Sequence, residues 1–493
     1  MEYSLNMNQK QQKIILPHQK TKIICTIGPA SRSSETLSKM ASFGMSVARL
    51  NFSHGSLEDH TQDIALLQKL AKTHNRIIPI LVDLPGVKLR IGELEQEPLE
   101  FKQDDYVTFT SEITKGTSSL ITIDYPEFYQ KVTKGTRLYL NDGFIELQVE
   151  ERTPTTVKTK VIIGGKIRSK KGMNIPDIRL FEESVTQHDL ELIDFALAQG
   201  IRIFSVSYVQ GKHDIEKVRD YAQDKGIPIA VIAKIECRGA LDHFDEILET
   251  ADGIMIARGD LGVEVPIEDV PSIQKRLIRK ANAAGKPVIT ATQMLKSMTQ
   301  HTRPTRAEAT DVANAILDGS DAVMLSEETA IGQYPLETVK MMATIAATTE
   351  KNKIENGISC TLRDEIALSG NHKNLSVADV ISLNVIEAHT ILEPRFILVT
   401  TASGNTARRI SRFKPTCWIL AFSRNVDTCR MLPFSYGVIP FHLENPEKSW
   451  HERILRYIKE QDLVKQGDIV LLTQRRFARD LGGTDSFGVI RIE

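Results

Sequence analysis

The sequence predicts an α/β protein built around a (β/α)8 barrel. Eight short apolar runs, each bounded by turn residues, recur along the chain. Stretches with helical spacing of their apolar residues separate most of these runs. Polar side chains follow the runs repeatedly, and in such a barrel the carboxyl ends of all eight strands meet at one mouth.

The eight expected strands follow one another in chain order. They begin at Lys22, Ser46, Ile77, Ile201, Ile229, Gly253, Lys286 and Asp321. Two of the helices between them are well marked. In residues 272–285 the apolar residues share one face and Gly285 is a C-cap, and in residues 303–319 Pro304 suits an early helical position.

A long interval between the third and fourth strands predicts an inserted domain. From Asp83 to Ile201 the chain is far too long for one helix, and its apolar residues alternate as they do in strands. Asn141-Asp142-Gly143 is a hairpin-turn signal between two such strands. We expect a small β-barrel lid over residues 88–182, which leaves residues 21–87 and 183–350 for the catalytic barrel.

The two ends of the chain complete the expected organisation. Residues 1–20 are polar and predict an N-terminal tail, and residues 351–493 repeat helix and strand patterns that predict a C-terminal α/β regulatory domain.

No apolar run approaches the length of a membrane span and the N-terminus has no signal-peptide core, so we expect a cytoplasmic protein with no membrane partner. The five cysteines have no metal-ligand or disulfide spacing. A net charge of −1 argues against nucleic acid as a partner.

Polar residues end nearly every expected strand. Any one of them could be a helix cap or a solvated loop residue. Their repetition at one mouth instead predicts an active site. The residues are Arg49, Asn51, Ser53, Asp83, Ser207, Lys234, Glu236, Arg258, Asp260, Thr292, Ser326 and Glu328.

Glu236 and Asp260 end neighbouring strands and suit a hard cation such as Mg²⁺ or Mn²⁺. The alternative is a pair of acids neutralised by Lys234 and Arg258. Lys234 points to the same side of its strand as Glu236. Lysine, arginine and a divalent cation around one space stabilise a phosphoryl group in transfer. A barrel lysine can also form a Schiff base, as in aldolases, and the sequence leaves that choice open.

Anion-binding groups are expected around these carboxylates. The amides of Gly259 and Asp260 begin a turn into a helix and can bind a carboxylate or phosphate. The chain has no P-loop motif, so a nucleotide would need other contacts. Arg90 and the basic run at 169–172, which includes Lys171, are candidates, and a solvated charge cluster is the alternative.

Several long motifs resemble those of the pyruvate kinase family. They are RLNFSHG (49–55), SKKGMNIP (169–176), AKIE (233–236), MIARGDLGVEVP (255–266), GKPVITATQML (285–295) and RPTRAEATDVANAILDGSDAVMLSEETAIGQYP (303–335). The resemblance runs from about Lys22 to GGTDSFGVI (482–490). It implies transfer of a phosphoryl group from phosphoenolpyruvate to ADP, which gives pyruvate and ATP in glycolysis, and it implies a homotetramer.

The resemblance also implies a role for each matching residue. Glu236 and Asp260 would hold Mg²⁺, and the amides of Gly259 and Asp260 would bind the substrate carboxylate. Lys234 would stabilise the transferring phosphoryl group, and Thr292 would help to protonate the enolate. Arg49 would contact the substrate phosphate, while Arg90 and Lys171 would contact the phosphates of ADP or ATP.

One departure from the family pattern concerns K⁺. Related enzymes hold this ion with the matches of Asn51, Ser53 and Asp83, together with a threonine and a nearby glutamate. Here Leu84 replaces the threonine and Lys88 replaces the glutamate. We expect the Lys88 ammonium to replace the ion, so that K⁺ is not required. The alternative is a lysine that faces solvent.

The C-terminal domain offers a candidate effector site. Ser403, Asn405 and Thr406 begin a helix where related enzymes bind phosphorylated allosteric activators, although an ordinary capped helix has the same sequence features.

Two other functions stay open for the whole chain. A metal-dependent barrel lyase or aldolase would have no use for the basic run and Arg90, and a catalytically inactive binding protein would have no need of an intact set of catalytic residues.

Overall fold

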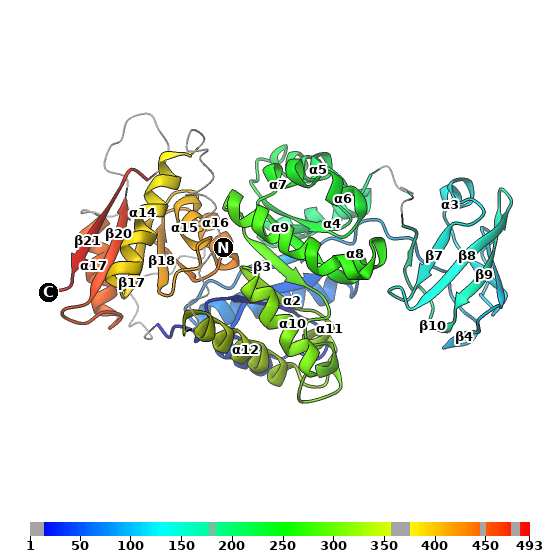
Figure 1. Ribbon diagram of the computed structural model, residues 1–493, viewed down its shortest axis with the longest axis horizontal. Helices are drawn as coiled ribbons and strands as arrows, with labels where there is room; N and C mark the ends of the chain where they lie inside the picture. The colour runs from blue at the N-terminus through cyan, green and yellow to red at the C-terminus, as the bar shows by residue number, and fades with distance from the viewer. Residues whose placement is uncertain (1–13, 177, 179–182, 356–374, 444–449, 475–483) are drawn as a thin grey trace.

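The computed structural model describes residues 14–176, 178, 183–355, 375–443, 450–474 and 484–493. The first 13 residues of the expected tail and the link at 356–374 therefore lie outside the described residues. Figure 1 shows a central barrel, an inserted β domain at one end of the molecule and a C-terminal domain at the other.

Eight parallel strands close into a TIM-type barrel, as expected. Their order around the barrel is β1-β16-β15-β14-β13-β12-β3-β2. The strands are β1 (Lys22–Thr26), β2 (Met45–Asn51), β3 (Ile80–Asp83), β12 (Ile203–Val206), β13 (Ala230–Ile235), β14 (Gly253–Ala257), β15 (Val288–Ala291) and β16 (Ala322–Leu325).

Helices surround this barrel. They are α1 (Ser34–Phe43), α2 (Leu57–Thr73), α4 (Gln187–Ala198), α5 (Lys212–Gln223), α6 (Arg238–Asp242), α7 (Phe244–Thr250), α8 (Arg258–Glu264), α9 (Val270–Ala284), α10 (Arg306–Leu317), α11 (Glu327–Ala330) and α12 (Pro335–Glu355), with 3-10 turns at Ile267–Asp269 and Lys296–Thr299. Gly285 ends α9 in a left-handed conformation, as its sequence position predicts.

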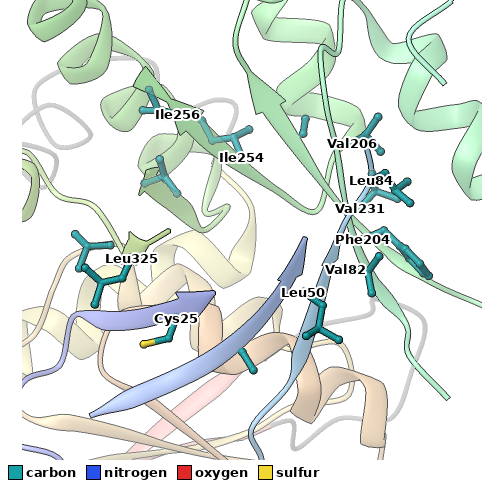
Figure 2. Packing of buried hydrophobic residues seen from close by; sticks show 14 of the residues in the cluster. Cys25, Leu50, Val82, Leu84, Phe204, Val206, Val231, Ile254, Ile256 and Leu325 are labelled. Atoms are coloured by element: carbon teal, nitrogen blue, oxygen red, sulfur yellow. The ribbon is translucent and has the colours of Figure 1, made fainter. Parts of the chain in front are cut away.

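The barrel strands alternate between two cores. Their outward side chains pack against the surrounding helices, and Figure 2 shows Cys25, Leu50 and Ile254 in this layer. The inward side chains form a second core, which includes Val47, Leu81, Ile203, Ile232 and Met255. Because side chains alternate with a period of two, the residues two positions further along β2, β3, β12 and β13 also face inward, at the mouth.

The inserted domain has its own apolar core. One sheet has six strands in the order β11-β7-β8-β9-β5-β6, and a second sheet pairs β10 with β4. A single cluster, which includes Phe101, Phe109, Leu147 and Ile167, joins the two sheets. The elements are β4 (Leu99–Phe101), β5 (Tyr106–Thr110), β6 (Leu120–Thr122), α3 (Pro126–Lys131), β7 (Arg137–Leu140), β8 (Ile145–Arg152), β9 (Thr156–Ile163), β10 (Gly165–Ile167) and β11 (Met173–Asn174). The expected hairpin connects β7 to β8.

The C-terminal domain is the expected α/β unit, with a sheet in the order β19-β18-β17-β20-β21. Its elements are α14 (Val377–Leu392), β17 (Phe396–Thr400), α15 (Asn405–Ser411), β18 (Trp418–Ser423), α16 (Val426–Met431), a 3-10 turn (Leu432–Phe434), β19 (Val438–His442), α17 (Trp450–Glu460), β20 (Ile469–Gln474) and β21 (Ser486–Arg491). Met431 and Phe434 join the inner core of the barrel, so this domain covers the end opposite the mouth. No described helix is long and apolar enough to cross a membrane.

Candidate active site

A buried group of charges lies at the ends of β2, β3 and β13. The guanidinium of Arg49 donates to Asp83 Oδ2 through Nε at 2.9 Å and also through Nη2. Lys234 Nζ is 3.2 Å from Asp83 Oδ1 and 3.0 Å from Glu236 Oε1. It also donates to Ser207 Oγ at 2.8 Å. Five of the predicted residues, from the ends of four strands, thus form one network.

The charges in this network stabilise one another. Burial alone would raise the pKa of Asp83, but Lys234 and Arg49 hold it below its ordinary value. Burial alone would lower the pKa of Lys234, but Asp83 and Glu236 hold it above its ordinary value. The lysine therefore keeps a positive charge in a site where only 11% of its side chain is exposed.

Glu236 and Asp260 face the same space and are linked by Tyr208. The amide of Tyr208 donates to Glu236 Oε2 at 2.8 Å, and its hydroxyl donates to Asp260 Oδ1 at 2.9 Å. Burial and the charge of Asp260 raise the pKa of Glu236 in spite of Lys234. Burial would raise the pKa of Asp260, but Lys88 and Lys234 hold it below its ordinary value.

These two carboxylates fit a hard divalent cation. Both offer oxygen atoms, their negative charges interact, and each already attracts an ammonium group. Among the described residues no cluster of three or more His, Cys, Asp or Glu side chains could hold a metal. The protein would then supply two ligands, as is common for Mg²⁺ sites that substrate and water complete.

The structure corrects the expected position of Lys88. Its ammonium lies 2.5 Å from Asp260 Oδ1 and not beside Asp83, whose oxygens contact Arg49, Lys234 and Ser205. Lys88 lies on the connection from β3 into the inserted domain, and its ammonium reaches Asp260, which follows β14. Sequence spacing shows how far Lys88 is from Asp83 along the chain, but not the direction of this connection.

The other two expected K⁺ ligands lie near Asp83. Asn51 is the register partner of Asp83 on the neighbouring strand. Its side-chain oxygen accepts a hydrogen bond from the amide of Ser53 at 3.2 Å. Asn51 therefore lies beside Asp83, and Ser53 hydrogen-bonds to Asn51.

The sequence suggested Glu236 or Asp260 as an ion-pair partner of Arg258, but in the structure Arg258 binds a different carboxylate. It chelates Asp311 of α10, with both contacts at 2.6 Å, and donates to the carbonyl of Thr292 at 3.0 Å. Thr292 has φ +68, which is unusual for a β-branched residue, and its hydroxyl accepts from the amide of Gly259 at 2.8 Å. Arg258 therefore supports a strained threonine at the mouth.

Basic residues from the inserted domain reach the same side of the mouth. Arg90 pairs with Gly172 in an isolated bridge and donates to the carbonyl of Lys170 at 3.0 Å. Burial lowers the pKa of His54, and the positive charges of Arg90, Arg49 and Lys171 lower it further. The expected nucleotide contacts, Arg90 and Lys171, therefore lie within electrostatic reach of His54, as Arg49 does.

The candidate effector residues make mostly internal contacts. Thr406 is buried against Thr484, and Asn405 Oδ1 accepts from Arg409 at 3.2 Å. The carbonyl of Ser403 accepts from Arg408 at 3.1 Å. These contacts match an ordinary helix start as well as they match a phosphate site.

The sequence reasoning gave no role to several residues of the site. Thr26 accepts from Arg49 Nη1 at 2.8 Å, and Ser205 donates to Asp83 Oδ1 at 2.8 Å. Both follow an inward apolar residue by two positions, so the strand period could have identified them. Asp311 lies on a distant helix, and nothing in the sequence marks it as the partner of Arg258.

Positive charge held beside carboxylates that fit a divalent cation is how proteins stabilise a phosphoryl group in transfer. On a (β/α)8 barrel with an inserted domain beside the mouth, this arrangement defines a barrel-type phosphotransferase. Family models described as the pyruvate kinase barrel domain and alpha/beta domain match residues 18–339 and 379–490. The chain belongs to the pyruvate kinase family.

Individual relatives agree with this assignment. A pyruvate kinase of Thermococcus litoralis is 46% identical over 97% of this chain and 99% of its own length. One from Geobacillus stearothermophilus is 40% identical over 94% of this chain and 79% of its own length. The crystal structure of a pyruvate kinase from Cryptosporidium parvum has a TM-score of 0.86 at 34% identity and covers 97% of both chains.

Proposed function

We propose that this enzyme transfers the phosphoryl group of phosphoenolpyruvate to ADP in a Mg²⁺-dependent reaction of glycolysis. The observation that carries the proposal is the buried network of Arg49, Asp83, Lys234 and Glu236 next to Asp260. It holds two fixed cations beside two carboxylates that fit a metal. A transferring phosphoryl group requires compensation of this kind.

Each residue has a role in this proposal. Arg49 and Lys234 bind the substrate phosphate from one side, and Lys234 stays with the phosphoryl group as its bond to the enol oxygen breaks. The amides of Gly259 and Asp260 hold the substrate carboxylate. A terminal β-phosphate oxygen of ADP attacks phosphorus, and Arg90 and Lys171 orient the ADP phosphates.

The last step is protonation of the enolate at its methylene carbon, which gives pyruvate. Thr292 lies beside this carbon and delivers the proton through water. Without substrate, its hydroxyl oxygen accepts from the amide of Gly259 and its proton points to the carbonyl of Ala291 at 2.7 Å. When the Gly259 amide turns to the substrate carboxylate, the O–H bond of Thr292 rotates toward the water. The strained backbone of Thr292 fixes the hydroxyl at the position that the proton must pass.

Glu236 and Asp260 would hold Mg²⁺, or Mn²⁺ in its place. When bound, the ion would neutralise charge on the substrate oxygens. Although burial opposes it, Lys88 and Lys234 hold the pKa of Asp260 below its ordinary value, which favours the ionised form that can bind a cation. A second Mg²⁺ would arrive with the nucleotide.

We propose that the enzyme does not require K⁺. Lys88 brings a fixed positive charge to the mouth through its contact with Asp260, although not at the position beside Asp83. The charge that a monovalent cation would supply is thus part of the chain. Asn51, Ser53 and Asp83 remain the candidate ion ligands if K⁺ does bind.

The cellular setting is proposed from the family. We place the enzyme in the cytoplasm, as a homotetramer whose C-terminal domain binds a phosphorylated effector near Ser403, Asn405 and Thr406. Sedimentation velocity tests the tetramer, because a 55.2 kDa chain and its tetramer separate clearly.

The experiment for the function measures pyruvate formed from phosphoenolpyruvate and ADP in a buffer without K⁺. We expect activity with Mg²⁺, none after chelation of divalent ions, and little change when K⁺ is added. Activity that appears only with K⁺ would retain the transfer reaction and reject the role of Lys88. No pyruvate under any of these conditions would reject the proposed function.

A further inference from the structure

Tyr208 joins both carboxylates of the proposed metal site. It follows β12, and its amide donates to Glu236 while its phenol hydroxyl donates to Asp260. Glu236 follows β13, and Asp260 belongs to α8 after β14. One residue therefore spans two neighbouring strand ends and holds a carboxylate at each.

The main chain of Tyr208 is fixed by its surroundings. Its φ is +53, a left-handed conformation that non-glycine residues adopt only where the surrounding structure imposes it. Ser184 Oγ donates to its carbonyl at 2.6 Å, and Glu236 accepts from its amide. The phenol ring also faces Lys88 Nζ, which lies 5.7 Å from the ring centroid. The hydroxyl thus has a well-defined position.

The two contacts of Asp260 use the same oxygen. Tyr208 and Lys88 both bind Oδ1, and no residue in the described parts of the chain hydrogen-bonds to Oδ2. The carboxylate cannot rotate without breaking these contacts. Oδ2 is therefore the oxygen that Asp260 can offer as a ligand.

We propose that Tyr208 is a positioning residue of the divalent-cation site, which sets the separation of Glu236 and Asp260 and presents Asp260 Oδ2 to the ion. This inference rests on the proposed function, because it requires these two carboxylates to be the metal ligands. Groups that orient metal ligands through hydrogen bonds typically change metal affinity 10- to 100-fold when they are removed. Tyr208 acts through both ligands and does not itself contact the ion.

The test is a Mn²⁺ titration of the full-length, substrate-free protein, with free Mn²⁺ measured by electron paramagnetic resonance. We expect Tyr208→Phe to weaken Mn²⁺ binding about tenfold, because it removes the hydroxyl and keeps the ring. Tyr221→Phe is the matched control, since its hydroxyl donates at 2.8 Å to Asp194, a carboxylate on α4. It should bind Mn²⁺ as the wild type does.

A second variant covers the case in which Tyr208→Phe fails to fold, which its thermal midpoint will show. Ser184→Ala frees the carbonyl of Tyr208 and keeps the hydroxyl, and we expect it to weaken Mn²⁺ binding severalfold. For both Tyr208→Phe and Ser184→Ala, steady-state kinetics should show a raised KM for Mg²⁺ and a smaller change in kcat at saturating Mg²⁺.

Asp260→Asn separates this inference from the metal site itself. If it abolishes Mn²⁺ binding while Tyr208→Phe and Ser184→Ala bind as the wild type does, the positioning role is wrong and the metal site stands. If Asp260→Asn binds Mn²⁺ as the wild type does, the metal site is wrong and the inference falls with it.

Discussion

Asp83 is the residue on which the buried charges of the mouth depend. It is 1% exposed and compensates two cations, Arg49 and Lys234. Removing one member of a buried ion network leaves the others without compensation, which costs more than the loss of a surface pair. The same residue thus maintains the stability of the mouth and the positions of the two cations to which we assign catalytic roles.

We expect Asp83→Asn to lower the free energy of unfolding by about 3–5 kcal/mol at pH 7. The control is Asp104→Asn, because Asp104 is 70% exposed and its pair with Lys160 should contribute little to stability. Urea denaturation of both variants measures the difference. Equal losses in the two variants would show that Asp83 has no special structural role.

The pH dependence of this effect has a definite sign. Because the pKa of Asp83 is lowered in the folded protein, its contribution is complete above the ordinary pKa of 3.8. It is lost as the pH falls from there through the lower folded value. The difference between wild type and Asp83→Asn should therefore stay constant from pH 8 to about pH 5, and shrink only below 3.8. A difference that shrinks between pH 8 and pH 5 would contradict the lowered pKa.

Arg258 acts on Thr292 through its planar guanidinium. Lysine cannot chelate Asp311 and also reach the carbonyl of Thr292, so we expect Arg258→Lys to lower kcat/KM about 10- to 100-fold. Arg219→Lys is the matched control, because Arg219 also binds a carboxylate and a main-chain carbonyl, on the outside of the barrel. Wild-type kinetics in Arg258→Lys would contradict the supporting role of Arg258.

At the level of the elements, the strand period connects the sequence to the site. On β2, β3 and β13 an inward apolar residue is followed two positions later by Arg49, Asp83 and Lys234. Eight strands and the parallel order explain why these residues converge, and both were predictable from apolar runs. The course of the chain after β3 was not predictable, which is why Lys88 was expected beside Asp83.

The connection after β3 depends on close packing at Gly86. Gly86 has φ +61, and an added Cβ would lie 2.9 Å from the Cβ of Ser207, which accepts from Lys234. We expect Gly86→Ala to displace Ser207 and lower kcat at least tenfold, in addition to a stability loss of about 1 kcal/mol from the left-handed conformation. Steady-state kinetics and thermal unfolding measure the two effects.

Gly226 is the matched control for Gly86. It has φ +71, but an added Cβ would meet nothing within 4 Å. Gly226→Ala should therefore lose about 1 kcal/mol of stability with unchanged kcat. If Gly86→Ala behaves in the same way, close packing at the start of the inserted domain has no effect on catalysis.

At the scale of the whole molecule, each domain covers a different part of the barrel. The C-terminal domain covers the end away from the mouth, where Met431 and Phe434 join the inner core. Lys414 of this domain forms an ion pair with Asp321 of the barrel at 2.7 Å, and each side chain is only 5% exposed. The inserted domain contributes Lys88 and Arg90 to the mouth itself.

This division explains what the sequence could predict. The barrel, the insertion and the C-terminal unit follow from local periodicity, and the residues of the mouth follow from strand ends. Contacts between elements that are far apart in the chain, such as Arg258 with Asp311 or Lys414 with Asp321, carry no local signal. They depend on how helices and domains pack, which the strand pattern does not determine.

The most direct test of the proposed phosphoryl transfer is the initial rate of pyruvate formation by Lys234→Met, with phosphoenolpyruvate, ADP and Mg²⁺. Methionine keeps much of the side-chain length and removes the charge, so we expect kcat to fall about 100- to 1,000-fold. Lys280→Met is the control, because Lys280 pairs with exposed Asp245 on the outer surface. A rate for Lys234→Met within a few-fold of the wild type would contradict phosphoryl transfer at this site.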